Sequence, residues 1–167
     1  MSDQVGVSHV AVVTADLDRF RAFYEDTIGL ETTIVFGTGG PGHARQAVVA
    51  TGNVMLHVFE IPGFDPARQG FAPAMFERGR LDHLGFAVAD EAALVALRDR
   101  LLAVDASSGS IRRLGPVLSV RFHDPDGLEG EINCLDPSYD PSTLRDEDEI
   151  VDPDWLERAR RLMRRDA

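Results

Sequence analysis

The sequence repeats itself once, because residues 7–20 (VSHVAVVTADLDRF) and 81–94 (LDHLGFAVADEAAL) align without a gap. The alignment places His9 opposite His83, 74 residues further along the chain. A chain that repeats at a fixed offset is expected to build the same supersecondary unit twice. At this offset the other notable pairs are Ala15 with Ala89, Asp16 with Asp90, and His57 with Glu131.

Each repeat has the pattern of a strand, a helix and three further strands. Runs rich in β-branched residues predict the strands, and an aspartate followed by apolar residues at helical spacing predicts each helix. Module one (5–61) is predicted to contain strands 7–14, 31–36, 45–51 and 54–61, and a helix from Asp16 to Gly29. Module two (81–135) is predicted to contain strands 81–88, 117–123 and 128–135, a short strand within 104–114, and a helix 91–103 capped by Asp90.

This order of predicted strands and helices indicates an α+β fold of two tandem βαβββ modules. The sequences Thr51-Gly52-Asn53 and Asp124-Pro125-Asp126-Gly127 are predicted to form hairpin turns. The two modules account for a domain spanning 1–135. Residues 136–167 form an appendage, which we predict to be an acidic linker followed by an amphipathic C-terminal helix starting at Asp152 and Pro153. The apolar stripe of that helix is Trp155, Leu156, Ala159, Leu162 and Met163.

Composition narrows the classes of function. Apolar residues make up 44% of the 167, enough for a packed core, and a net charge of −11 disfavours binding to nucleic acid or to anionic membranes. No apolar run suits a membrane helix or a signal peptide, so we expect a cytoplasmic protein. The single cysteine, Cys134, excludes a cysteine-cluster metal site and is expected to be a small buried residue.

Four side chains at equivalent repeat positions have the chemistry of metal ligands: His9, His57, His83 and Glu131. In a duplicated module such positions face each other across the pseudo-twofold axis, so these residues are expected to share one cavity. Three imidazoles and one carboxylate suit Fe, Mn, Ni, Co or Zn better than Ca or Mg. The alternative is that they are ordinary pocket residues of a duplicated sheet.

The other histidines carry weaker signals. His43 lies in a glycine-rich loop, TGGPGHAR (38–45), which favours a surface or gating role. His123 ends a predicted strand and shares strand parity with Arg121, so both are expected on one side of the sheet. An apolar cup is expected around the four ligand-type residues. Its candidate lining residues are Phe36, Phe59, Phe64, Phe71, Met75 and Phe76, several of them in the linker 61–80, which is either a lid or a hydrophobic strap.

The paired modules, the strand start LDHLGFAV (81–88) and the segment FHDPDGLEGEI (122–132) resemble the vicinal oxygen chelate superfamily. That superfamily contains glyoxalase I, methylmalonyl-CoA epimerase, extradiol dioxygenases, fosfomycin-resistance enzymes and bleomycin-binding proteins. The resemblance implies a cupped mixed β-sheet, a small-molecule substrate and a homodimer. It also implies that His9, His83 and Glu131 form a two-histidine, one-carboxylate metal triad, with His57 where relatives commonly carry a glutamate or glutamine.

Several reactions are compatible with this resemblance. The leading expectation is a divalent-metal enzyme that chelates adjacent oxygens of a small organic substrate. Its reaction is expected to be that of a lyase or isomerase and to pass through an enolate, with Glu131 or His57 transferring a proton. A second is an Fe(II)-dependent dioxygenase, although the tyrosine and histidine typical of ring-cleaving relatives are missing before Asp124. A third is a metal-free protein that sequesters an antibiotic. Substrate-pocket candidates are Phe36, Phe59, Arg121 and His123.

Overall fold

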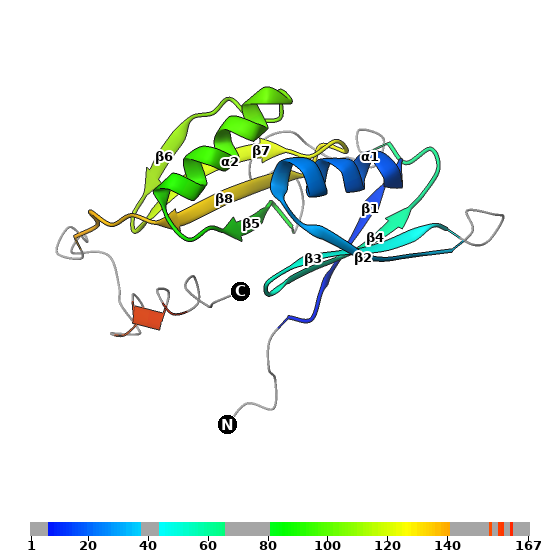
Figure 1. Cartoon of the computed structure of the whole chain (residues 1–167), viewed down its shortest axis with the longest axis horizontal. Helices are drawn as coiled ribbons and strands as arrows, with labels where there is room; N and C mark the ends of the chain where they lie inside the picture. The colour runs from blue at the N-terminus through cyan, green and yellow to red at the C-terminus, as the bar shows by residue number, and fades with distance from the viewer. Residues whose placement is uncertain are drawn as a thin grey trace. The chain divides into compact units, whose positions relative to one another are not determined.

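The computed structural model describes residues 7–37, 44–65 and 81–140, together with 154, 157, 158 and 161. The chain divides into two compact units, drawn in Figure 1. The first comprises 1–82 with 124–128, and the second comprises 83–123 with 129–167. Each unit is built around a four-stranded mixed sheet, and each is described separately below.

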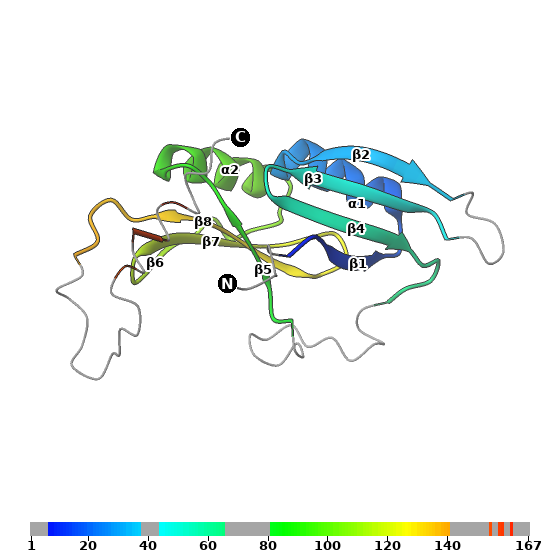
Figure 2. The same cartoon turned by 90° about the horizontal axis from the view of Figure 1, so that it is seen from below.

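The first unit has the βαβββ order expected for module one. Its strands lie in the order β1-β4-β3-β2, with β1 parallel to β4 and the other neighbours antiparallel, and α1 lies on one face (Figure 2). The elements are β1 (Val10–Thr14), α1 (Leu17–Ala22), the π-helix η1 (Phe23–Ile28), β2 (Glu31–Phe36), β3 (Gln46–Thr51) and β4 (Val54–Glu60).

The helix of the first unit starts and stops at the predicted residues. The Asp16 side chain accepts hydrogen bonds from the amides of Asp18 and Arg19, and Gly29 ends the helix with a φ of 91°. Its second half winds as a π-helix, which the apolar spacing did not predict. The helix buries one face against β3 and β4, and the core residues here are Leu17, Phe20, Tyr24, Ala47, Val49, Leu56 and Val58.

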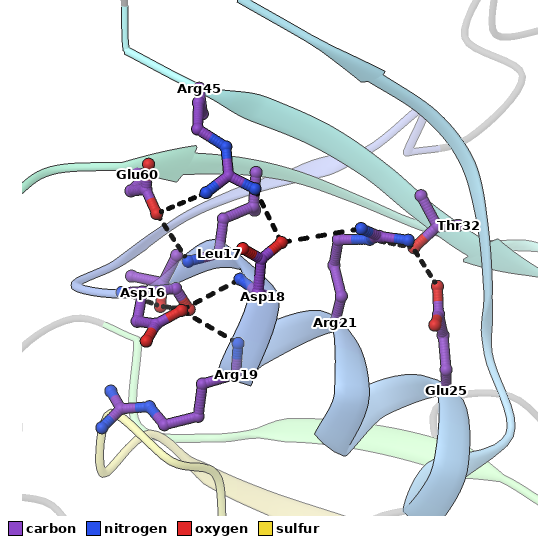
Figure 3. A network of polar contacts seen from close by, with 10 residues as sticks. Asp16, Leu17, Asp18, Arg19, Arg21, Glu25, Thr32, Arg45 and Glu60 are labelled. Carbon is purple, nitrogen blue, oxygen red and sulfur yellow. Dashed lines mark hydrogen bonds and ion pairs between the residues drawn. The ribbon is translucent and has the colours of Figure 1, made fainter. Parts of the chain in front are cut away.

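A polar network ties the start of α1 to the sheet beside it (Figure 3). Glu60, at the end of β4, accepts a hydrogen bond of 2.9 Å from the amide of Leu17 and lies 3.4 Å from Arg45. Arg45 also reaches Asp18 at 2.6 Å, and this pairing lowers the pKa of the Asp18 carboxyl. Glu60 therefore satisfies the backbone amide of Leu17 in the first turn of α1, and Arg45 pairs with the carboxylates of both Glu60 and Asp18.

The second unit repeats the same topology. Its strands lie in the order β5-β8-β7-β6, with β5 parallel to β8, and α2 covers one face of the sheet. Apolar side chains of α2 and the sheet form its core, including the predicted buried Cys134. The elements are β5 (Leu84–Ala87), α2 (Glu91–Ala103), β6 (Ile111–Leu114), β7 (Val117–His123) and β8 (Glu129–Leu135). The α+β fold of two tandem βαβββ modules is therefore confirmed.

Both first strands are shorter than predicted. β1 begins at Val10 and β5 at Leu84, because their parallel ladders with β4 and β8 start only there. His9 and His83 consequently each lie one residue before a strand rather than inside it. The two positions remain equivalent, so the repeat holds at the level of the backbone.

The turn between β7 and β8 groups with the first unit. Asp126 accepts hydrogen bonds from the Thr14 hydroxyl at 2.6 Å and from the amide of Ala15 at 3.2 Å, and it pairs with Arg19 at 2.7 Å. Asp124 accepts a hydrogen bond from the buried Tyr24 hydroxyl at 3.2 Å. The chain therefore passes into the first unit and back within five residues.

Several predictions concern residues outside the described part of the chain. They are the loop carrying His43, the linker residues Phe71, Met75 and Phe76, and the apolar stripe of the C-terminal helix. Within the described part, no helix is long and apolar enough to cross a membrane.

Candidate functional site

The face of the first sheet opposite α1 is centred on His57 in β4. Residues that pair across strands point to the same face, so His57 has Ala11 of β1 and Val48 of β3 as direct neighbours. Its Nε2 lies 3.0 Å from Oε1 of Gln46. The imidazole and its partner Gln46 thus lie among apolar side chains of this face.

Aromatic rings surround His57. Its ring centroid lies 4.3 Å from that of Phe59, 5.7 Å from that of Phe36 and 5.9 Å from that of His9. The sequence placed both phenylalanines in the pocket, and the structure brings both against the predicted ligand. The same face also exposes apolar side chains to solvent, namely Val13, Ile34 and Met55.

His9 comes from the segment just before β1. Its Nδ1 lies 3.0 Å from the Ser8 hydroxyl, and its ring packs edge-on to that of His57 at an interplanar angle of 67°. Two of the four predicted ligands are therefore neighbours within the first unit.

The second unit places its equivalent pair in the same way. His83, just before β5, has its Nε2 3.2 Å from Oε2 of Glu131 in the middle of β8. The Ser119 hydroxyl of β7 donates a hydrogen bond to the other carboxylate oxygen, Oε1. Glu131 therefore has its two oxygens engaged by side chains from β7 and from the segment just before β5.

A charged cluster continues along the same face of the second sheet. Arg121 and His123 alternate with Phe122 along β7, and both reach Glu129 of β8, at 3.4 and 3.7 Å. The predicted shared side of Arg121 and His123 is thus confirmed. The Glu129 side chain is 5% exposed, so its charge is held beside the Arg121 guanidinium away from bulk water.

The geometry of the His83–Glu131 pair is compatible with metal binding. Two donors about 2.0–2.2 Å from one ion, in tetrahedral or octahedral geometry, are separated by about 3 Å, which is close to the spacing between His83 and Glu131. Within the described residues, no group of three or more histidine, cysteine, aspartate or glutamate side chains is close enough to hold an ion. The four predicted ligands thus form two pairs, one in each unit.

Two groups in contact have raised pKa values, Asp124 at the turn between β7 and β8 and Tyr24 in η1. Burial, together with the charge of Asp126, raises the pKa of Asp124 to about 6, although hydrogen bonds from the amides of Leu128 and Asp126 act in the opposite direction. Burial, followed by the nearby charge of Asp124, raises the pKa of the Tyr24 hydroxyl well above its usual value.

Sequence reasoning missed three polar residues of these faces: Gln46, Ser119 and Glu129. Strand parity was the available signal. Glu129 lies two residues before Glu131 on one strand, so alternation puts both on one face. Gln46 and Ser119 become visible only once the registers β3–β4 and β7–β8 are known.

Two successive βαβββ modules, each placing a histidine beside its first strand near a ligand-type residue on its fourth, define a paired-module fold. The sequence profile of the Glyoxalase/Bleomycin resistance protein/Dioxygenase superfamily matches residues 6–132. The chain belongs to this superfamily, which confirms the resemblance to the vicinal oxygen chelate proteins. A comparison with curated proteins finds no match.

Solved structures share the fold. A glyoxylase/bleomycin resistance protein/dioxygenase domain from Frankia sp. is 24% identical with a TM-score of 0.65, covering 80% of this chain and 100% of its own. Lactoylglutathione lyase from Agrobacterium tumefaciens is 25% identical with a TM-score of 0.53, covering 78% and 94%. The fosfomycin resistance protein FosX from Listeria monocytogenes, complexed with Mn(II) and sulfate, is 17% identical with a TM-score of 0.58, covering 80% and 95%.

Proposed function

We propose that this protein is a divalent-metal-dependent enzyme with lyase or isomerase chemistry on a small organic substrate that carries two adjacent oxygens. One observation carries the proposal. In each unit, a histidine beside the first strand approaches a ligand-type side chain in the middle of the fourth, as the pairs His9 with His57 and His83 with Glu131. A purely structural role would not require this arrangement in both modules.

The proposed ligands are His9 and His57 in the first unit and His83 and Glu131 in the second. Imidazole nitrogens with a single carboxylate favour Fe, Ni, Co, Mn or Zn. FosX, which shares the fold, was crystallised with Mn(II), one of these metals. A bound divalent cation supplies Lewis-acid polarisation of substrate oxygens.

Proton movement is assigned to His57 and Glu131. An imidazole and a carboxylate are the side chains most suited to general acid–base chemistry near neutral pH. Ser119 donates to Oε1 of Glu131, which leaves Oε2, the oxygen near His83, as the atom for ligation or proton transfer. Substrate contacts are assigned to Phe36 and Phe59 in the first unit and to Arg121 and His123 in the second.

Metal content tests this proposal directly. We expect tag-free protein, analysed by mass spectrometry after reconstitution, to hold a stoichiometric amount of a transition metal, and His83→Ala or Glu131→Ala to lose it. His123→Ala is the matched control, because it removes an imidazole from the same sheet without touching a proposed ligand, and it should keep the metal. A wild type that stays metal-free would overturn the enzyme assignment and favour a binding protein that sequesters its ligand.

A second candidate function is an Fe(II)-dependent dioxygenase. It is favoured by the residue types of His9, His83 and Glu131, which match the two-histidine, one-carboxylate set of non-haem iron oxygenases. Oxygen consumption distinguishes the two functions. Uptake with iron, and none with zinc or nickel, would support the dioxygenase, whereas turnover without oxygen uptake would support the lyase or isomerase.

We also propose that the protein is a homodimer. The edge strand β2 exposes three consecutive apolar residues, Ile34, Val35 and Phe36, to solvent. An exposed apolar sheet edge is costly in an isolated subunit and favours pairing with another chain.

A further inference from the structure

Gln46 contacts His57 through a diagonal between neighbouring strands. In the β3–β4 register, the direct partner of His57 is Val48, and Gln46 lies two residues before Val48 on the same face. From this position Oε1 of Gln46 reaches Nε2 of His57 at 3.0 Å. The contact therefore depends on strand register and is partly shielded from water.

The second unit has a polar contact on the same diagonal. In the β7–β8 register, the direct partner of Glu131 is Arg121, and Ser119 lies two residues before Arg121. The Ser119 hydroxyl donates to Glu131. Both modules thus use a polar residue of the third strand to hold the ligand-type residue of the fourth.

The side-chain atom of Gln46 that faces the imidazole determines which ring nitrogen of His57 carries the proton. A neutral imidazole carries one N–H, and its other nitrogen presents a lone pair. With the Gln46 amide oxygen facing the ring, that oxygen can only accept a hydrogen bond, so in the neutral imidazole Nε2 carries the proton and Nδ1 presents the lone pair. The aromatic rings of Phe36 and Phe59 beside His57 further restrict rotation of the imidazole.

We propose that Gln46 is a positioning residue that holds His57 with its proton on Nε2, so that Nδ1 is the nitrogen that binds the metal or accepts a proton. The assignment of that role to His57 rests on the proposed function. Partners that orient a ligating histidine through its other nitrogen commonly control metal affinity.

Nitrogen-15 NMR of the full, metal-free chain tests the hydrogen bond. We expect a slowly exchanging Nε2–H of His57 in the wild type, assigned by its loss in His57→Asn. Gln46→Leu should abolish its protection, and Gln46→Glu, which keeps an acceptor, should restore it. Ser119→Ala is the control, because it removes the equivalent contact from the other unit and should leave the His57 signal unchanged. A wild-type His57 protonated on Nδ1 would overturn the proposal.

Addition of Zn²⁺ tests the role of Nδ1. We expect Zn²⁺ to shift the Nδ1 resonance of His57 while Nε2–H is retained, and Gln46→Leu to weaken Zn²⁺ affinity by about 10–100-fold. A Zn²⁺-induced shift at Nε2, or unchanged affinity in Gln46→Leu, would contradict the inference. If Zn²⁺ fails to bind the wild type, the metal-dependent function fails and with it the ligand role of Nδ1, whereas the metal-free spectra still decide the hydrogen bond.

Discussion

Asp124 is buried at the start of the turn between β7 and β8, where it faces the hydroxyl of Tyr24. Its pKa is raised to about 6 by burial and by the charge of Asp126. The folded protein therefore binds this proton more tightly than the unfolded chain does. The resulting stabilisation is fully present below about pH 3.8 and is lost as the pH rises through about 6.

Asp124→Asn should remove this dependence on pH. The amide oxygen can still accept hydrogen bonds from the amides of Asp126 and Leu128, as Oδ1 of Asp124 does, but it carries no charge. A pKa difference of about two units corresponds to about 3 kcal/mol. We expect the free energy of unfolding of Asp124→Asn, relative to the wild type, to rise by about 2–3 kcal/mol between pH 4 and pH 7.

Urea denaturation at several pH values in this range measures the effect. Asp26→Asn, which removes an exposed carboxyl from η1 of the same unit, is the control and should follow the wild type. If the free energy of unfolding changes with pH in the same way for the wild type and Asp124→Asn, the buried carboxyl does not govern this part of the pH dependence.

At the scale of single elements, local chemistry accounts for where the helices begin and how tightly the second sheet packs. Asp16 and Asp90, equivalent in the repeat, both cap their helices by accepting backbone hydrogen bonds. In the second sheet, Gly130 of β8 is the direct partner of Phe122 of β7. The ring of Phe122 occupies the space that a side chain at 130 would need, since a Cβ there would lie 2.1 Å from its Cζ.

Gly130→Ala should therefore destabilise the protein. Phe122 is 1% exposed and has little room to move, so the added methyl forces an overpacked core, which costs about 1–3 kcal/mol. Gly85→Ala in the neighbouring strand β5 is the matched control, because its Cβ would meet only the Asn133 side chain at 3.3 Å. Thermal or urea unfolding of both variants provides the comparison, and equal stability of the two would contradict the packing argument.

At the scale of the whole molecule, an acidic chain with a net charge of −11 exposes an apolar edge strand. Self-repulsion keeps such a chain soluble, and association would cover the edge. We expect sedimentation equilibrium to give the mass of a dimer. Val35→Lys should weaken the dimer by placing a desolvated charge at the edge, while Met55→Lys on the inner strand β4 should leave it intact. A wild type that sediments as a monomer would rule out the dimer.

Patterns local in sequence were sufficient to predict both modules. Alternating and helical periodicities, two capping aspartates and the hairpin turns specify βαβββ twice, and the repeat relates His9 to His83 and His57 to Glu131. The π-helical half of the first helix was missed, because apolar spacing does not distinguish it from an α-helix over so few residues.

Contacts between elements had to come from the tertiary structure. The pairing of Gln46 with His57 and of Ser119 with Glu131 depends on strand register, which is set by long-range hydrogen bonding. Similarly, the turn at Asp124 is recognisable in the sequence, but its burial against Tyr24 is not. The repeat therefore determined which residues correspond, whereas packing decided what each of them touches, because burial and register arise only when distant segments meet.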